Sequence, residues 1–253
     1  MSVYVITEVS KGIGFELVKQ ISDNTNNLVV GLVRDKNSTK KMVKAGLGER
    51  SNVHILYGDL TSYASLKQAA VDTAKIVGEC GIDYLVANVA YLTLFNAFDP
   101  LGALSDKVEE LEEVSSKVFQ TNLTGNIHLF NLFLPQVLKG KVKKVIAISS
   151  GHTDLDFIND SETEFSAFYS AGKAAMNVMV AKYSAQYKKD VCSSSIQGAT
   201  RLMAKFAAYA PHFKGPVSVE EAIQTIRAAW EKASIENGYS GAFVSQFGNK
   251  QWL

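Results

Sequence analysis

Short runs rich in valine and isoleucine alternate with longer amphipathic stretches along nearly the whole chain. Such runs are typical of strands buried on both faces of a parallel sheet, and the stretches between them are typical of crossover helices. The sequence therefore predicts an α/β, doubly wound fold with a seven-stranded, mostly parallel sheet and helices on both faces. The expected strands are 3–7, 28–33, 53–57, 84–88, 144–149, 191–196 and 242–246, and the expected helices are 12–21, 62–77, 104–138, 164–187 and 219–234.

Local signals mark some of the helix boundaries. Thr61, Ser62 and Ser218 are candidate N-caps. The stretch 104–138 is one long helix or two, because Asn122-Leu123-Thr124-Gly125 would weaken its middle. A doubly wound sheet binds ligands at the carboxyl ends of its strands, where the strand order reverses. We therefore expect the functional site at that edge.

Length and composition exclude several classes of protein. At 253 residues the chain is long enough for one well-buried domain and short for two, so we expect a single domain over 1–253. The net charge of +1 gives no electrostatic reason to bind nucleic acid or a lipid surface. Two cysteines make no disulfide framework and the histidines show no metal-ligand spacing, so no metal is expected. With neither a signal peptide nor a membrane span in the sequence, the expectation is a soluble, cytoplasmic protein.

The segment "TEVSKGIG", Thr7 to Gly14, follows the first expected strand and leads into the first expected helix. Gly12 and Gly14 would let the backbone approach a pyrophosphate and let the helix pack tightly on the strand. The helix N-terminus would then face the phosphates. The alternative is a tight strand–helix turn that binds no ligand.

The ends of the second and third strands carry candidate nucleotide contacts. Arg34 stands where a cation would hold a ribose 2′-phosphate, and Lys11 could add a second charge, which favours NADP over NAD. Asp35 is an acidic residue in the same place and weakens that preference, and Arg34 could instead be a solvated surface charge. Asp59 and Leu60 stand where an adenine ring would lie, although Asp59 or Thr61 could equally begin the next helix.

"YSAGK" places Tyr169 and Lys173 four residues apart on one helix face. A neighbouring ammonium would favour the ionised phenol and lower its pKa toward neutrality. Ser150, just after a strand, can donate to a carbonyl oxygen, and Asn122 can hold a water that relays protons to Lys173. Tyr63 and Lys67 share the same spacing, but nothing catalytic precedes them, so we treat that pair as a decoy.

These motifs together resemble the short-chain dehydrogenase/reductase family, a Rossmann-fold family, over essentially the whole chain. "TEVSKGIG" is similar to the glycine turn of that family, "YGDL" to its adenine motif and "VANVA" to its Asn-Asn-Ala-Gly segment, while "TNLTG", "ISS" and "YSAGK" carry its asparagine, serine and Tyr-x3-Lys. The resemblance implies a catalytic tetrad of Asn122, Ser150, Tyr169 and Lys173. It implies hydride transfer between NADP(H) and a carbonyl or alcohol, most similar to carbonyl reductases and secondary-metabolite ketoreductases. It further implies a homodimer or homotetramer through the helices 104–138 and 164–187. The implied cofactor-binding residues are Thr7, Ser10, Lys11, Gly12, Ile13, Gly14, Arg34, Asp59, Leu60, Asn88, Tyr169, Lys173 and Thr200.

The chain departs from the family pattern around the expected cofactor. Glu8 replaces the first glycine of the turn, Ala90 a glycine after the fourth strand, Gln197 a proline after the sixth, and Leu202 a threonine. If position 8 needs a left-handed backbone, its side chain costs roughly 1–2 kcal/mol. A carboxylate about 5 Å from a pyrophosphate charge adds about 3 kcal/mol, unless it turns to solvent or pairs with Lys11.

Three functions therefore stay open: an NADP-linked reductase, which we favour, a non-redox catalyst such as a cyclase, isomerase or dehydratase, and a binding protein without turnover. A small-molecule substrate is expected under a flap at about 198–216. The flap carries Leu202, Met203, Phe206, Tyr209, His212 and Phe213, and Tyr91, Leu92, Leu94 and Phe95 follow the fourth strand. These side chains predict an apolar pocket, or else they only pack the flap onto the body. His152 could contact the substrate or be solvated.

Overall fold

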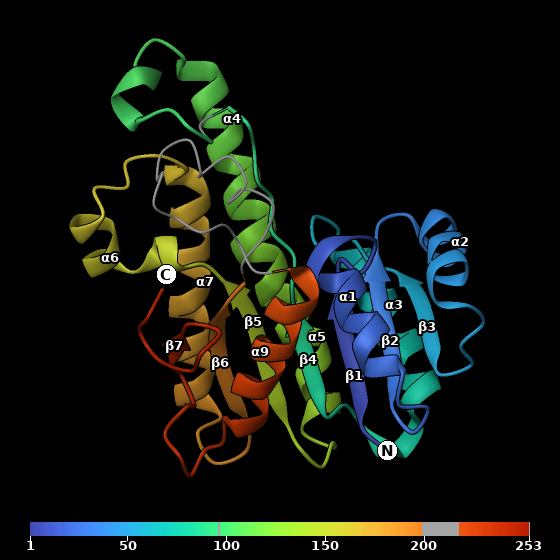
Figure 1. Cartoon of the computed structure of the whole chain (residues 1–253). Coiled ribbons are helices and arrows are strands. Elements are labelled where there is room, and N and C mark those ends of the chain that lie inside the picture. The colour runs from blue at the N-terminus through green and yellow to red at the C-terminus, as the bar shows by residue number, and fades with distance from the viewer. Residues whose placement is uncertain (96, 199–217, 253) are drawn as a thin grey trace.

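A seven-stranded sheet, parallel throughout, forms the centre of the protein in a computed structural model that describes residues 1–95, 97–198 and 218–252. Its spatial order is β3-β2-β1-β4-β5-β6-β7 (Figure 1). This confirms the predicted doubly wound fold. The strands are β1 Val3–Thr7, β2 Leu28–Val33, β3 Val53–Tyr57, β4 Tyr84–Ala87, β5 Lys144–Ser149, β6 Cys192–Gln197 and β7 Phe243–Val244.

The strand order reverses between β1 and β4. From β1 the chain builds outward through β2 to β3, and it then returns to place β4 on the other side of β1. The turns that follow β1 and β4 therefore diverge at the carboxyl edge, which is the upper edge in Figure 1. A crevice at this edge is where a sheet of this topology binds its ligand.

Helices cover both faces of the sheet (Figure 1). The core on one face is filled by side chains of α3, α5 and α7, and the core on the other by side chains of α1, α2 and α9. The helices are α1 Gly12–Ser22, α2 Lys36–Leu47, α3 Tyr63–Val77, α4 Val108–Phe119, α5 Gly125–Val137, α6 Leu155–Asp160, α7 Ala167–Gln186 and α9 Val219–Lys232, with short 3₁₀ turns at Gly78–Cys80, Leu101–Leu104 and Gly151–Thr153.

The stretch 104–138 contains two helices, α4 and α5, joined by a π-helical turn over Gln120–Thr124. The weak point expected at Asn122 to Gly125 is therefore where the helical geometry changes. Gly125 is required there, because a Cβ on it would lie 2.4 Å from the carbonyl oxygen of Leu60. Of the expected N-caps, Ser62 and Ser218 accept from the backbone of Ser65 and Glu221, whereas Thr61 bonds to Asp59 instead.

Two helices were not expected from the sequence. In α2 only Thr39 and Val43 are buried, so the apolar stripe that would reveal this lysine-rich helix is nearly absent. The six-residue α6 buries none of its residues. The single domain over 1–253 and its flap stay predictions, because 199–216 lies outside the described residues.

Candidate active site

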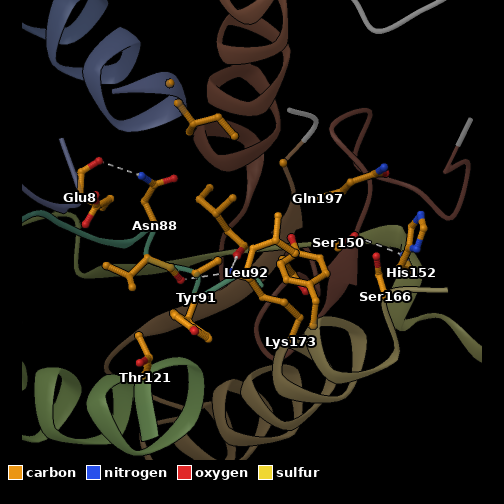
Figure 2. Close-up of a pocket in the computed structure, with 18 of the residues that line it drawn as sticks. Glu8, Asn88, Tyr91, Leu92, Thr121, Ser150, His152, Ser166, Lys173 and Gln197 are labelled. Atoms are coloured by element: carbon orange, nitrogen blue, oxygen red, sulfur yellow. Dashed lines mark hydrogen bonds between the residues drawn. The ribbon is translucent and has the colours of Figure 1, made fainter. Parts of the chain in front are cut away.

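A cavity of about 1360 Å³ opens at the carboxyl edge of the sheet. It brings together most of the side chains expected at the site, from both halves of the fold (Figure 2). Thr7, Ser10, Gly14 and Asn122 do not line it, and Thr200 lies outside the described residues. The expected residues that do line it are Lys11, Gly12, Ile13, Arg34, Asp59, Leu60, Asn88, Ser150, Tyr169 and Lys173.

Lys173 reaches from α7 to the ends of two central strands. Its Nζ donates to the carbonyl oxygens of Ile148 (2.6 Å) and Val89 (3.2 Å), and its side chain is almost wholly buried. Burial lowers the pKa of Lys173 to about 7, because a charged ammonium is poorly solvated there. The lysine is therefore held rigidly and loses most of its charge just above neutral pH.

Tyr169 stands one turn earlier on the same helix face. Its surface is partly accessible, yet burial raises its pKa to about 12, and a hydrogen bond with the Ser150 side chain opposes that rise. The expectation of a pKa lowered toward neutrality is therefore wrong for the protein alone, because desolvation of the phenol outweighs the hydrogen bond that lowers its pKa. The phenol is instead a protonated group at neutral pH, ready to donate.

Asn122 is fully buried in the π-helical turn and supports the site from behind. Its side-chain oxygen accepts from the backbone N–H of Tyr91 (2.7 Å), and its side-chain nitrogen donates to the carbonyl oxygen of the same residue (3.2 Å). A Cβ on Gly172 would lie 3.0 Å from that nitrogen, so α7 packs directly on the turn. Asn122 thus fixes the loop after β4, and its water relay to Lys173 stays a prediction.

The turn after β1 has the close packing that the glycines predicted. A Cβ on Gly14 would lie 2.1 Å from the carbonyl oxygen of Glu8, so only glycine fits. Asn88 donates from its side chain to the carbonyl oxygens of Thr7 (3.2 Å) and Glu8 (3.4 Å). The Thr7 hydroxyl accepts from the Asn88 N–H (2.9 Å). Thr7 and Asn88 thereby hold the ends of β1 and β4 in register beside the crevice.

Glu8 itself adopts a left-handed backbone, with φ of 55°. This is the conformation in which a side chain is strained. The Ser10 hydroxyl donates to its carboxylate (3.2 Å), and no Glu8–Lys11 ion pair occurs among the described residues. The carboxylate therefore has no cationic partner among the described residues, and Glu8 lines the cavity close to the N-terminus of α1.

Arg34 and Asp35 have different tasks after β2. The Asp35 carboxylate accepts from the Ser38 N–H (2.9 Å) and caps α2. Arg34 is exposed and lines the cavity, whereas Asp35 does not. The Asp59 carboxylate accepts hydrogen bonds from the N–H (2.9 Å) and the hydroxyl (2.8 Å) of Thr61. Leu60, between these two residues, is buried.

The far end of the cavity contains residues that the sequence motifs did not indicate. Trp252 lines it beside Gln197, although 55 positions separate them in the chain. Phe157 and Phe165 come from the segment between β5 and α7, and the His152 ring lies against both. Burial lowers the pKa of His152, so it is neutral at physiological pH. Contacts of this kind join distant segments, and no spacing along the chain could have revealed them.

The apolar residues expected near the substrate divide into two groups. Tyr91 and Leu92 line the cavity, whereas Leu94, which is 77 % exposed, and Phe95 do not. Leu202, Met203, Phe206, Tyr209, His212 and Phe213 lie outside the described residues. Within the described ranges there is no cluster of metal-ligating side chains, and no helix is long and apolar enough to cross a membrane.

Comparison with known proteins agrees with this geometry. The profile of the short chain dehydrogenase family matches residues 2–201. A short-chain dehydrogenase/reductase of Pestalotiopsis fici, iacC, is 62% identical over 272 aligned positions that cover 100% of both chains. The chain belongs to the short-chain dehydrogenase family.

Further members of this family match along the full chain. A short chain dehydrogenase of Hypocrea virens, virK, is 46% identical, again over 100% of both chains. The solved structure of an NADPH-bound carbonyl reductase from chicken fatty liver superposes with a TM-score of 0.75 at 20% identity, covering 98% of this chain and 93% of that one. This last likeness concerns the fold.

Proposed function

We propose that this protein is an NADP(H)-dependent reductase that reduces the carbonyl group of a mostly apolar small molecule. One observation carries the proposal: Tyr169 and Lys173 line the same cavity as Gly12 and Arg34. A candidate proton donor and the residues expected to bind a dinucleotide thus share one cavity. The names of the relatives, which include dehydrogenases and an NADPH-bound carbonyl reductase, support it.

The described residues fit a dinucleotide. Gly12 has φ of 57° and open space around its Cα, and the N-terminus of α1 provides unpaired N–H groups for a pyrophosphate. With Asp35 used as a helix cap, Arg34 is free to pair with a 2′-phosphate, which supports NADP over NAD. Asp59, Leu60 and Asn88 would line the adenosine and ribose portions of the site.

The chemistry divides between the coenzyme and the side chains. The reduced nicotinamide, when bound, supplies the hydride that reaches the carbonyl carbon. Tyr169 donates its phenolic proton to the carbonyl oxygen, and the Ser150 hydroxyl donates a hydrogen bond to the same oxygen. Lys173, fixed by Ile148 and Val89, would hold the ribose of the bound coenzyme and would replace the proton that Tyr169 gives up.

The test is a stoichiometric assay with matched variants. Oxidation of NADPH, followed by absorbance, should equal the alcohol formed, and Tyr169→Phe should lower kcat at least about 100-fold with NADPH affinity unchanged. Tyr63→Phe removes the hydroxyl of the decoy pair; Tyr63 is half exposed and packs edge-on to His128 outside the cavity, so turnover should be unchanged. Substrate turnover without NADPH oxidation would contradict the proposal.

That last outcome would favour the second candidate, a non-redox acid–base catalyst. The observation that supports a non-redox catalyst is that Glu8, with its carboxylate, lines the cavity where a pyrophosphate would lie. Tyr169 would then act on the substrate alone. Ligand binding without any turnover, and unaffected by Tyr169→Phe, would indicate a binding protein.

We further propose that the protein assembles as a homodimer or homotetramer through α4, α5 and α7. Val108 and Phe119 on α4 and Val178 on α7 are large apolar side chains left exposed in the single chain. Sedimentation equilibrium should give a mass of two or four chains. A monomer at micromolar concentration would contradict this.

A further inference from the structure

One wall of the cavity is built by two residues that end neighbouring strands. Gln197, the last residue of β6, is in register with Ser149, the last residue of β5. Register partners in a parallel sheet project to the same face. Both residues are buried, with relative exposures of 7% and 1%, and both line the cavity.

The Gln197 side chain is fixed by the C-terminal segment. Its Nε2 donates to the carbonyl oxygen of Trp252 (3.2 Å), and the Trp252 ring stacks on Phe243 with centroids 4.5 Å apart. A Cβ on Gly151 would come within 3.1 Å of Trp252 and 3.4 Å of Gln197 Nε2, so the three residues are closely packed. Because the nitrogen must donate to Trp252, the orientation of the amide is determined.

The other end of that amide has no hydrogen-bond partner in the part of the chain that the structure describes. Gln197 Oε1 and Ser149 Oγ are both enclosed and form no hydrogen bond with any residue that the structure describes. Buried polar atoms are nearly always paired, since an unpaired one loses its hydration without compensation. A carbonyl oxygen can only accept, so Gln197 Oε1 requires a donor.

The position of this acceptor indicates which ligand supplies the donor. Figure 2 shows Gln197 on the side of the pocket that carries Ser150 and His152, away from Glu8 and Asn88 in the dinucleotide turn. Trp252, Phe157 and Phe165 line the same cavity and give it an aromatic character. A flat, mostly apolar ligand would fit here, and one polar acceptor would fix its orientation.

We propose that Gln197 is a substrate-binding residue whose Oε1 accepts a hydrogen bond from a hydroxyl group of the substrate. This deepens the proposed function: the natural substrate is an aromatic ketone that also carries a hydroxyl group. A site with a buried acceptor discriminates strongly against an analogue without the donor, because the acceptor is then left unpaired.

The experiment uses acetophenone and its three ring-hydroxylated isomers as probes. Their affinity for the full-length protein saturated with NADP⁺ is measured by calorimetry, for the wild type, Gln197→Met and Gln136→Met. Gln136 is a matched control: its Nε2 donates to Ala70 (2.9 Å), its Oε1 has no partner within the described chain, and it does not line the cavity. Thermal unfolding confirms that each variant is folded.

The wild type should bind at least one hydroxylated isomer about tenfold more tightly than acetophenone. Gln197→Met should abolish this difference without changing the affinity for acetophenone. Gln136→Met should keep the preference for the hydroxylated isomer. No preference in the wild type, or a preference that survives Gln197→Met, overturns the proposal. The proposal is also overturned if Gln197→Met lowers only the affinity for the coenzyme, because Gln197 Oε1 would then accept from the amide of the nicotinamide.

These affinities, together with the NADPH assay, distinguish a failure of the proposed redox function from a failure of the proposed role of Gln197. If the hydroxyl preference depends on Gln197 but no ketone oxidises NADPH, the redox assignment is wrong and the role of Gln197 in recognition stands.

Discussion

Glu8 combines a strained backbone with a carboxylate that forms no ion pair with any residue the structure describes. Its φ of 55° lies where glycine is favoured, and its carboxylate is bonded to the neutral Ser10 hydroxyl. Two substitutions separate these effects. Glu8→Gly removes both, whereas Glu8→Gln removes the charge and leaves the strained backbone.

We expect both variants to bind NADPH at least about tenfold more tightly, since each removes the repulsion of the phosphates. Only Glu8→Gly should also raise stability, by about 1 kcal/mol or a Tm higher by ~2 °C. Fluorescence titration and thermal unfolding measure the two quantities. Unchanged affinity in both variants would show that the carboxylate does not face the coenzyme.

The lowered pKa of Lys173 predicts that the stability of the protein depends on pH. Its pKa is 10.5 as a free side chain and about 7 in the fold. Between these values the unfolded chain holds a proton that the folded chain has released, so stability rises with pH, by up to about 1.4 kcal/mol per pH unit. Below pH 7 Lys173 is protonated in both the folded and the unfolded state, so the cost of burying its charge lowers the stability by its full amount.

The free energy of unfolding in urea, measured at pH 7 and pH 9, should therefore increase with pH more for the wild type than for Lys173→Met. Lys67→Met removes an exposed lysine of the decoy pair and should follow the wild-type profile. Parallel profiles for the wild type and Lys173→Met would show that Lys173 keeps its proton in the folded protein.

The sequence predicted which residues gather at the cavity better than it predicted their interactions. Glycine spacing and the Tyr169–Lys173 pair were visible because they are local patterns. The pKa of Tyr169 was not, since it depends on how deeply the fold buries the phenol. Likewise, only the hydrogen bond to Ser38 shows that Asp35 caps a helix and leaves Arg34 to the cavity.

The packing of α1 on β1 depends on Gly14 far more than on Gly12. A Cβ at position 14 would lie 2.1 Å from the Glu8 oxygen and 2.8 Å from the Asn88 amide. At position 12 nothing lies within 4 Å, and only the left-handed φ of 57° disfavours a side chain.

Gly14→Ala should accordingly destabilise the protein by about 3 kcal/mol, as overpacking against a backbone does, and Gly12→Ala by about 1 kcal/mol. The free energies of unfolding in urea measure both. Equal losses at the two positions would mean that the turn relaxes freely and does not fix the first helix.

Elements with a strong apolar pattern were predicted almost to the residue, and elements without one were missed. Expected strands 3–7, 28–33, 53–57 and 144–149 match β1, β2, β3 and β5, because each is a short, mainly apolar run. β7 contains only Phe243–Val244 of the expected 242–246. α2 and α6 were not predicted because they bury few side chains and therefore carry few of the apolar residues that reveal a helix.

At the scale of the whole molecule, the doubly wound topology explains why motifs from five strand ends meet. Residues after β1, β2, β3, β4 and β5 all reach one edge, and α7 brings Tyr169 and Lys173 to the same cavity. The C-terminal Trp252 closes the opposite end against Gln197. The fold thus gathers the ends of the central strands and one face of α7 around a single cavity.

The most direct test of this account is a fluorescence titration of the wild type and Arg34→Gln with NADPH and with NADH. The account predicts that the wild type binds NADPH at least about tenfold more tightly than NADH, because the Arg34 guanidinium pairs with the 2′-phosphate. Arg34→Gln should remove the preference and leave the affinity for NADH unchanged. A wild-type protein that binds neither coenzyme at millimolar concentration, or binds NADH more tightly, would contradict it.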